Sequence, residues 1–276
     1  MTLAGLLKEG RERLKAEGIA EWELDAWYLL EYAAGCTRSG YFMHPEQEVL
    51  PDREQVYRDL IAKRSSHIPL QHLTGSQEFM GLSFFVDENV LIPRQDTEIL
   101  VEEALGVLAP GMRVLDLCTG SGCILLSILR LCPGLSGTGT DLSEKALSTA
   151  RRNAEHLGIA ADFCQGDLFE NIFGTYDCIV SNPPYIASRE VDALMEEVRD
   201  HEPRMALDGG ADGLSFYRRI AEACPDYLEP SGRIFLEIGY DQGKAVAELL
   251  RPAFEEIRIV QDLSGLDRVV CGVLRS

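Results

Sequence analysis

The hydrophobic pattern of the first quarter of the chain is helical. From Thr2 to about Ser66, apolar side chains recur at helical spacing, beginning with Leu3, Leu6 and Leu7, and no strand is evident. Helices of this length are marginally stable alone, because most helical stability comes from tertiary packing. The pattern therefore predicts a small helical bundle held together through its apolar stripes.

A short region of different pattern follows the helical part. Prolines and glycines interrupt residues 68–93, and the β-rich run Leu82–Val86 lies among them, which predicts a hairpin that links two domains. The predicted organisation is an N-terminal helical domain over residues 1–72, a hairpin linker over 73–94 and a larger domain over 95–276.

From residue 95 onward, short apolar strands alternate with helical stretches, which is typical of a parallel sheet with crossover helices. The last two strands are separated only by a short turn, so there is no room for a crossover helix and the last strand must run antiparallel. The seven predicted strands cover residues 113–117, 137–141, 162–165, 176–181, 232–238, 257–261 and 268–274. The helices between them cover residues 123–131, 144–157 and 243–253.

A glycine turn follows the first of these strands and leads directly into a helix. It reads Cys118-Thr119-Gly120-Ser121-Gly122. Glycines let a ligand approach the backbone, whose N–H groups and helix N-terminus favour polar or anionic groups. Asp116 strengthens this interpretation, because an acidic side chain at the end of an otherwise apolar strand is unusual unless it has a structural or functional role. The turn alone is weak evidence, because a plain tight turn uses the same residues.

Acidic residues also follow the second and third strands. Asp141 is placed to accept both hydroxyls of a ribose, and its alternative role is that of a helix N-terminal residue near Ser143. Asp167 and Leu168 fall where an adenine ring would lie. Together they would provide an acceptor for the exocyclic amine of the ring and an apolar wall beside it. Their alternative role is that of a solvated turn. A dinucleotide site is the rival interpretation, but the full G-x-G-x-x-G is absent and nothing supplies a second phosphate site.

The most informative motif is Ser181-Asn182-Pro183-Pro184-Tyr185, directly after an apolar strand. The prolines remove two backbone donors and stiffen the loop, so the Asn182 side chain and the Pro183 carbonyl keep unmet hydrogen-bonding capacity. A primary amide, or an amino group on a flat π-system, fits this arrangement, with Tyr185 packing on its face. The chemistry is positioning rather than base catalysis. A structural turn is the alternative use of two prolines.

Charge and composition narrow the class of partner. The 276 residues carry a net charge of -19, of which -3 falls in residues 1–75 and -16 in residues 76–276. Tight DNA binding draws on a basic field, so duplex DNA is a poor candidate and a basic protein a better one. The acidic side chains are alternatively a solvated surface.

Membrane, secretion and metal signals are absent from the sequence. The longest nearly apolar stretch, Gly122–Cys132, is shorter than the roughly 18 residues a membrane span needs. The N-terminus has no apolar core followed by a cleavage site, so we expect a cytoplasmic protein. The eight cysteines form no C-x-x-C pair and no zinc spacing, which predicts buried thiols and no metal site.

Taken over nearly its whole length, the sequence resembles the PrmC/HemK protein methyltransferases, which methylate the glutamine of the Gly-Gly-Gln motif in peptide chain release factors. Besides the glycine turn and Asn182–Tyr185, the shared segments are Pro69–Gly75, Phe79–Phe84, Val90–Arg94, Glu202-Pro203, Leu236–Gly239, Gln242-Gly243 and Asp262–Gly265 with Arg268.

The resemblance implies an α/β, Rossmann-like class I fold of the S-adenosylmethionine-dependent methyltransferases. It has a seven-stranded sheet with the last strand antiparallel, behind an N-terminal helical bundle and a β-hairpin linker. It also implies S-adenosyl-L-methionine as the cofactor and class I release factors as substrates, methylated at the glutamine N5 so that translation termination is modulated. The helical domain would grip the release factor, and we expect a monomer that binds neither DNA nor membrane.

Site residues follow from the motifs and the resemblance together. The expected catalytic residues are Asn182, Pro183 and Tyr185, and Pro184 joins them in binding the target glutamine. The expected cofactor-binding residues are Asp116, Cys118, Thr119, Gly120, Ser121, Gly122, Asp141, Asp167, Leu168 and Asn182.

Three positions depart from the family pattern. Cys118 stands where the family usually has glycine; a small residue fits there if its backbone φ is negative, and the substitution could slightly alter the approach of the cofactor. Gln95-Asp96-Thr97-Glu98 replaces the usual Pro-Glu-Thr-Glu and keeps acids at 96 and 98. Leu168 replaces a frequent aromatic, which would weaken stacking on adenine.

Two rival functions remain at this stage. A nucleic-acid adenine methyltransferase shares the Asn-Pro-Pro-Tyr motif, but it would need a basic face and a means of extracting the base, and neither is evident. A catalytically silent binding module would keep the fold only as a scaffold. Such a module would be expected to have lost residues of the glycine turn or of the Asn-Pro-Pro-Tyr motif, and both are intact here apart from Cys118.

Overall fold

The structure is a computed structural model that describes residues 1–275. It divides into two compact units, each with its own hydrophobic core. The first comprises Met1–Gly75 together with Met195–His201, and the second comprises Ser76–Leu194 together with the chain from Glu202 onward. Each unit is described by itself.

The first unit is a helical bundle, as predicted. Its core contains Leu6, Leu14 and Leu30, all inaccessible to solvent, which are the apolar positions of the helical pattern. Thr2 caps the first helix, because its side chain accepts a hydrogen bond from the Gly5 N–H. The helices are α1 (Leu3–Ala16), α2 (Trp22–Ala34), α3 (Arg38–Met43), α4 (Pro51–Arg64), α5 (Leu70–Thr74) and α10 (Glu196–His201).

Helix α10 comes from a distant part of the chain and is held to the first unit by a buried ion pair. The Arg64 guanidinium, 3% exposed, donates from Nε to Asp25 at 2.7 Å and from its terminal nitrogen to Glu197. A buried charge is stabilised only when paired. The two carboxylates provide that pairing.

The second unit is built on one seven-stranded sheet, in the order β5-β4-β3-β6-β7-β9-β8. Strands β3 to β7 run parallel to one another, whereas β9 lies antiparallel between β7 and β8. The antiparallel last strand is therefore confirmed. The strands are β3 (Arg113–Leu117), β4 (Ser136–Asp141), β5 (Asp162–Gln165), β6 (Tyr176–Ser181), β7 (Leu228–Glu237), β8 (Phe254–Gln261) and β9 (Asp267–Leu274).

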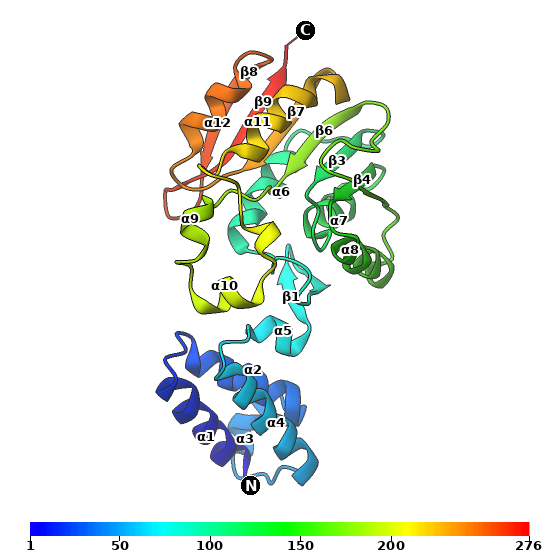
Figure 1. Ribbon diagram of the computed structural model, residues 1–276. Helices are drawn as coiled ribbons and strands as arrows, with labels where there is room; N and C mark the ends of the chain where they lie inside the picture. The colour runs from blue at the N-terminus through cyan, green and yellow to red at the C-terminus, as the bar shows by residue number, and fades with distance from the viewer. Residues whose placement is uncertain (276) are drawn as a thin grey trace. The chain divides into compact units, whose positions relative to one another are not determined.

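Helices cover both faces of this sheet (Figure 1). On one face Tyr217, Ile220 and Val246 of α11 and α12 pack on the strands, and on the other Leu100 and Leu125 of α6 and α7 do so, together with α8. The helices are α6 (Glu98–Leu105), α7 (Cys123–Leu131), α8 (Glu144–Leu157), α9 (Ser188–Val191), α11 (Ser215–Ala223) and α12 (Gly243–Leu250). Single 3₁₀ turns are η1 (Gln95–Thr97), η2 (Arg204–Ala206) and η3 (Cys224–Tyr227).

The predicted hairpin is formed by β1 (Ser76–Phe79) and β2 (Leu82–Phe85). It packs in the second unit, where the buried rings of Phe79 and Phe84 join the core beside α6 and α7. The Asn153 side chain of α8 fixes it by accepting from the Phe85 N–H and donating to the Phe85 carbonyl.

The prediction of buried thiols holds for half of the cysteines. All eight cysteines are free thiols, of which Cys123, Cys178, Cys224 and Cys271 are buried and the other four are partly accessible. Within residues 1–275, no helix is both long enough and apolar enough to cross a membrane. The same residues contain no cluster of three or more potential metal ligands.

Candidate functional site

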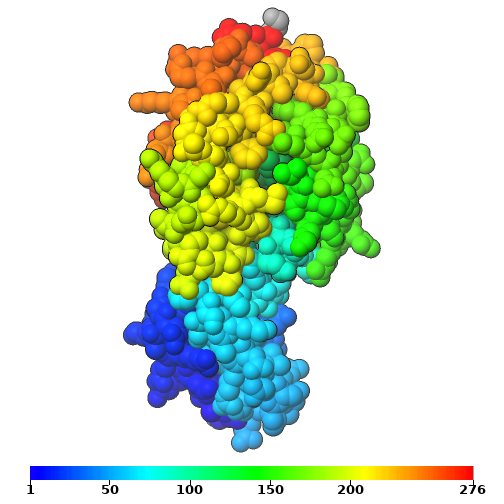
Figure 2. All heavy atoms as spheres, viewed as in Figure 1, coloured from blue at the N-terminus to red at the C-terminus, as the bar shows by residue number. Residues whose placement is uncertain are grey.

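A cavity of about 290 Å³ lies in the second unit at the carboxyl ends of β3, β4 and β6. Ligands of open α/β sheets bind at this edge. In the space-filling view the surface is hollowed between the yellow segment that contains η2 and α11 and the green segment that follows β4 (Figure 2). The cavity brings together nine of the predicted site residues, namely Cys118, Thr119, Gly120, Ser121, Asp141, Asp167, Leu168, Asn182 and Pro184.

Four predicted site residues do not line this cavity: Asp116, Gly122, Pro183 and Tyr185. Asp116 lies fully buried beneath the glycine turn, where its Oδ2 accepts the Thr119 hydroxyl at 2.6 Å. Burial raises the pKa of Asp116 to about 7, against the opposing Thr119 hydrogen bond. Gly122, at φ 80°, precedes α7, where a Cβ would press on Ala150 of α8 at 3.2 Å. Asp116 and Gly122 therefore support the glycine turn without lining the cavity.

Cys118 does not meet the condition under which a side chain fits easily in place of the family glycine. Its φ is +58°, in the left-handed region, rather than negative. A non-glycine residue there costs roughly 1–2 kcal/mol, which explains why glycine suits this position. Burial raises the pKa of the Cys118 thiol, and the neighbouring Asp141 adds to the effect, so the thiol stays protonated. It is part of the cavity wall rather than a reactive group.

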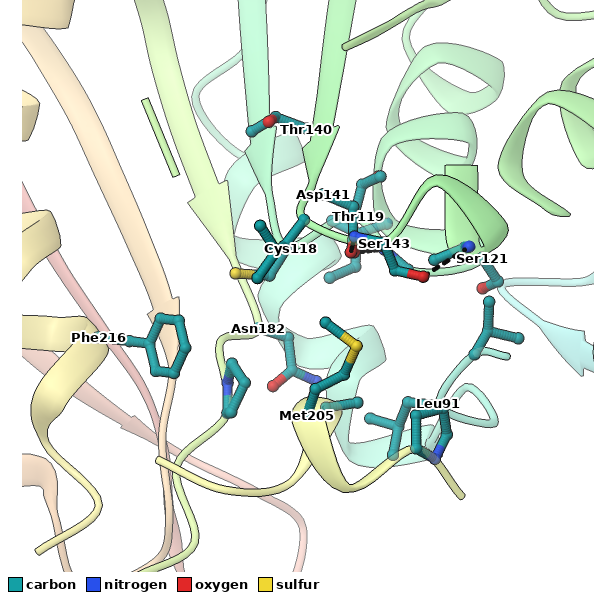
Figure 3. Close-up of a pocket in the computed structure, with 18 of the residues that line it drawn as sticks. Leu91, Cys118, Thr119, Ser121, Thr140, Asp141, Ser143, Asn182, Met205 and Phe216 are labelled. Atoms are coloured by element: carbon teal, nitrogen blue, oxygen red, sulfur yellow. Dashed lines mark hydrogen bonds between the residues drawn. The ribbon is translucent and has the colours of Figure 1, made fainter. Parts of the chain in front are cut away.

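Asp141 lies just before α8 and is hydrogen-bonded to the glycine turn as well. Its Oδ1 accepts the Ser143 N–H at 2.8 Å before α8, and its Oδ2 accepts the Gly120 N–H at 2.9 Å in the glycine turn. Burial raises the pKa of Asp141 above its ordinary value. Each carboxylate oxygen keeps further lone pairs for a ligand. The carboxylate is thus clamped between two loops while it lines the cavity (Figure 3).

The third loop forms an apolar wall with a charged edge. Leu168 is 5% exposed, lines the cavity and packs into the core. Asp167 also lines the cavity, but its Oδ1 is paired with the Arg219 guanidinium of α11 at 2.9 Å. Phe216 of the same helix lines the cavity too. An aromatic ring that does not come from the third loop is therefore available to a flat ligand.

The Asn-Pro-Pro-Tyr loop is anchored at its start and along its backbone. The Ser181 hydroxyl donates to the Leu117 carbonyl at 2.7 Å, which ties β6 to β3 at the cavity edge. The Gln242 side chain donates to the Tyr185 carbonyl at 2.9 Å. The Gly209 N–H donates to the Ile186 carbonyl at 2.8 Å. Asn182 lies among the cavity-lining side chains (Figure 3).

Several residues that shape the site were not assigned a role from the sequence. Gln242 and Glu237 lie in segments shared with the PrmC/HemK family, and this resemblance is the sequence feature that could have indicated a role for them. Met205 and Phe216 line the cavity, but no sequence pattern marks them. Their contribution depends on tertiary packing alone.

The backbone of Gly209 lies directly against the backbone of the Asn-Pro-Pro-Tyr loop, where there is no room for a side chain. A Cβ at Gly209 would lie 2.7 Å from the Pro184 oxygen and 2.8 Å from the Tyr185 Cα, so the loop must shift. We expect Gly209→Ala to lower the free energy of unfolding by roughly 1–3 kcal/mol and to reduce kcat, without weakening cofactor binding.

The matched control is Gly158→Ala at the end of α8, where φ is +64° and nothing lies within 4 Å. It should lose stability through backbone strain but keep the wild-type kcat. Equal kcat losses in the two variants would show that the close approach of Gly209 has no special importance for the loop.

Glu237, at the end of β7, is a buried acid next to this loop. It is 2% exposed and its Oε2 has no hydrogen-bond partner. Burial raises the pKa of Glu237 to about 7, although hydrogen bonds from Thr97 and Asn182 and the charge of Arg268 oppose the shift. Its native form therefore binds a proton more tightly than the unfolded chain does.

A pH dependence of stability follows from this raised pKa. Below the ordinary value of 4.5 both states are protonated, and between 4.5 and about 7 the native state holds more protons, so the free energy of unfolding declines as pH rises. Glu237→Gln removes this titration. We expect its stability relative to wild type to be more favourable at about pH 8 than at about pH 5 in urea unfolding. Asp116 titrates in both proteins, and parallel profiles would contradict the assignment.

The sheet with its antiparallel strand, the glycine turn and the acid after the second strand define a class I S-adenosylmethionine-dependent methyltransferase fold. A family model described as "Methyltransferase small domain" matches residues 95–211, and one described as "PrmC N-terminal domain" matches residues 5–75. The chain is 41% identical to the release factor glutamine methyltransferase of Geobacter sulfurreducens, over 98% of this chain and 96% of that one. The chain belongs to the release factor glutamine methyltransferase family.

Solved structures agree on the fold. A methyltransferase from Pyrococcus furiosus matches with a TM-score of 0.56 at 18% identity, covering 71% of this chain and 90% of that one. The Thermus thermophilus 16S rRNA N2 G1207 methyltransferase, solved with AdoMet and guanosine, matches with a TM-score of 0.53 at 18% identity, covering 72% and 50%. At this identity the two likenesses concern the fold alone.

Proposed function

We propose that this chain transfers a methyl group from S-adenosylmethionine to the side-chain amide N5 of the glutamine in the Gly-Gly-Gln motif of class I peptide chain release factors. The transfer would modulate translation termination. The observation that supports this most directly is Asn182, whose amide lies in a cavity shared with the glycine turn and Asp141. Membership of the release factor glutamine methyltransferase family supports the choice of substrate.

The donor set of the cavity fits S-adenosylmethionine. Asp141 offers carboxylate lone pairs to a ribose, and the Leu168 side chain offers an apolar wall to a purine. The volume of about 290 Å³ is near the lower end of the range for small-molecule sites. We assign cofactor binding to Cys118–Ser121, Asp141, Asp167, Leu168 and Asn182, with Asp116 and Gly122 shaping the turn. When bound, S-adenosylmethionine supplies a methyl group activated by the positive charge of its sulfonium.

The target amide is held by the Asn-Pro-Pro-Tyr loop in this proposal. The Asn182 oxygen accepts one N–H of the glutamine amide and the Pro183 carbonyl accepts the other, while Tyr185 packs on the amide plane and Pro184 stiffens the loop. These contacts direct the nitrogen lone pair toward the methyl group. By accepting the two N–H groups, the oxygens also polarise the N–H bonds toward nitrogen, and one of these protons would be released to water as the N–C bond forms and the methyl–sulfur bond breaks. Rate then comes from alignment and from fixed dipoles.

We further propose how the chain works in the cell. Residues 1–72 form a substrate-recognition domain that grips the release factor, residues 73–94 form the linker, and residues 95–276 form the catalytic domain. The enzyme acts as a cytoplasmic monomer and does not bind DNA. The net charge of -16 over residues 76–276 supports the last point.

Transfer of labelled methyl from S-adenosylmethionine tests this function. A purified bacterial class I release factor should become labelled, and a variant with asparagine in place of the Gly-Gly-Gln glutamine should not, because the shorter side chain withdraws the amide from the loop. Label in an adenine-containing oligonucleotide, but not in the release factor, would indicate the nucleic-acid alternative. Absence of cofactor binding would indicate a silent scaffold. Either outcome would overturn the proposal.

A further inference from the structure

We propose that Thr97 and Glu237 are positioning residues that fix the Asn182 amide with its oxygen facing the target glutamine. This inference rests on the proposed function and deepens it. It concerns the orientation of one side-chain amide, whose two ends have opposite hydrogen-bonding character. Only an oxygen facing the target can accept the N–H of a glutamine amide.

The Asn182, Thr97 and Glu237 side chains lie together in the second unit. Asn182 Nδ2 donates to the Thr97 hydroxyl oxygen at 3.4 Å. Both side chains also lie close enough to the Glu237 carboxyl to oppose, as hydrogen-bond donors, the rise of its pKa on burial. Thr97 and Glu237 are each 2% exposed, so water does not compete for these groups. Thr97 comes from η1 and Glu237 from the end of β7, next to the end of β6 that leads into Asn182.

The direction of the hydrogen bonds among these side chains follows from the donor inventory. An ionised carboxylate only accepts hydrogen bonds, whereas a hydroxyl has one proton to donate. The Thr97 proton is therefore directed to Glu237, and the Thr97 oxygen is left to accept from the Asn182 amide nitrogen. A flipped Asn182 would place two acceptors against Thr97 and would turn its N–H groups toward the donors of the target. The flip would therefore lose a buried hydrogen bond. It would also leave the target amide without an acceptor for its N–H group.

The Glu237 carboxylate is held by opposite charge. The Arg268 guanidinium acts on Glu237 electrostatically and is itself fixed by Asp262 at 3.0 Å and Asp96 at 3.2 Å. The Tyr217 hydroxyl donates to the Glu237 backbone carbonyl at 2.8 Å, which anchors the residue from the α11 side. A buried charge needs such support to persist. Glu237 is thereby kept as a fixed acceptor.

The decisive comparison is between Thr97→Val and Thr97→Ser, assayed at about pH 8, above the Glu237 pKa of about 7. Valine keeps the shape and removes the hydroxyl, so we expect kcat to fall about tenfold, with KM for the release factor and cofactor affinity within about twofold of wild type. Serine restores the hydroxyl and should recover most of the kcat. Thr138→Val, which removes a hydroxyl bonded to Tyr176 away from the cavity, should behave as wild type.

An independent readout does not require turnover. In protein labelled with ¹⁵N-asparagine, the Asn182 side-chain NH₂ signal, assigned by its loss in Asn182→Ala, should exchange more slowly in wild type and Thr97→Ser than in Thr97→Val. Wild-type kcat in Thr97→Val, equal impairment of the valine and serine variants, or equal exchange in all three would overturn the inference. If wild type fails to label the release factor, the proposed function fails, and the exchange measurement still decides the orientation.

Discussion

Replacing Asn182 with alanine is expected to lower kcat by roughly 10³-fold or more, whereas cofactor affinity should fall far less, because Asn182 is only one of the residues assigned to cofactor binding. The Asn182 amide is the group that accepts an N–H of the target in the proposed reaction, and it lies in the cavity beside the glycine turn. Removing it leaves the target amide without its main alignment. The change should be measured as methyl transfer to a release factor, with S-adenosylmethionine binding followed by calorimetry.

The Asn182 prediction has a natural control in Asn182→Asp. Aspartate keeps an acceptor but replaces the donor to Thr97 with a second acceptor, so partial activity is expected. Unaltered turnover in Asn182→Ala would remove Asn182 from the reaction. A parallel loss of cofactor binding would show instead that the alanine variant disturbs the whole cavity.

The second large effect is expected at Asp141. Replacing it with asparagine should weaken S-adenosylmethionine binding by about 10- to 100-fold, because hydrogen bonds to a charged group contribute roughly 1.5–3 kcal/mol. With the cofactor at saturating concentration, kcat should be close to wild type. Titration calorimetry measures the affinity, and initial rates over a range of cofactor concentrations separate KM from kcat.

A matched control for Asp141 is Asp177→Asn. The Asp177 carboxylate also accepts a backbone N–H, that of Arg113 at 2.7 Å, and it does not line the cavity. Its variant should keep the wild-type cofactor affinity. If both variants bind the cofactor as wild type does, then Asp141 serves only to hold the Gly120 and Ser143 N–H groups.

The fold was largely predictable because most strands and helices keep a regular pattern. The limits of β3, β5, β6, α7 and α8 agree with the sequence pattern. The differences have local causes. Strand β8 begins at Phe254 rather than Ile257, since an irregularity between Glu255 and Arg258 breaks the alternation. Helix α12 ends at Leu250 rather than Ala253, because Pro252 disfavours a helical residue before it.

The motifs located the cavity, but not the interactions behind them. The glycine turn, Asp141 and Asn182 could be named because each follows a strand. The Cys118 φ of +58° could not be predicted from its residue type. Glycine and asparagine are the residues typical of a left-handed backbone position, and cysteine is not. The pairing of Arg64 with Glu197, 133 residues away, has no local signature. Such contacts arise from tertiary structure.

The most direct test of the proposed function is mass spectrometry of a release factor incubated with this protein and S-adenosylmethionine, with the added mass mapped to its residue and atom. We expect one methyl group on the side-chain nitrogen of the Gly-Gly-Gln glutamine, and none in the Asn182→Ala reaction. A methyl group on any other residue, or none despite intact cofactor binding, would contradict the assignment of Asn182 and its loop to a glutamine amide.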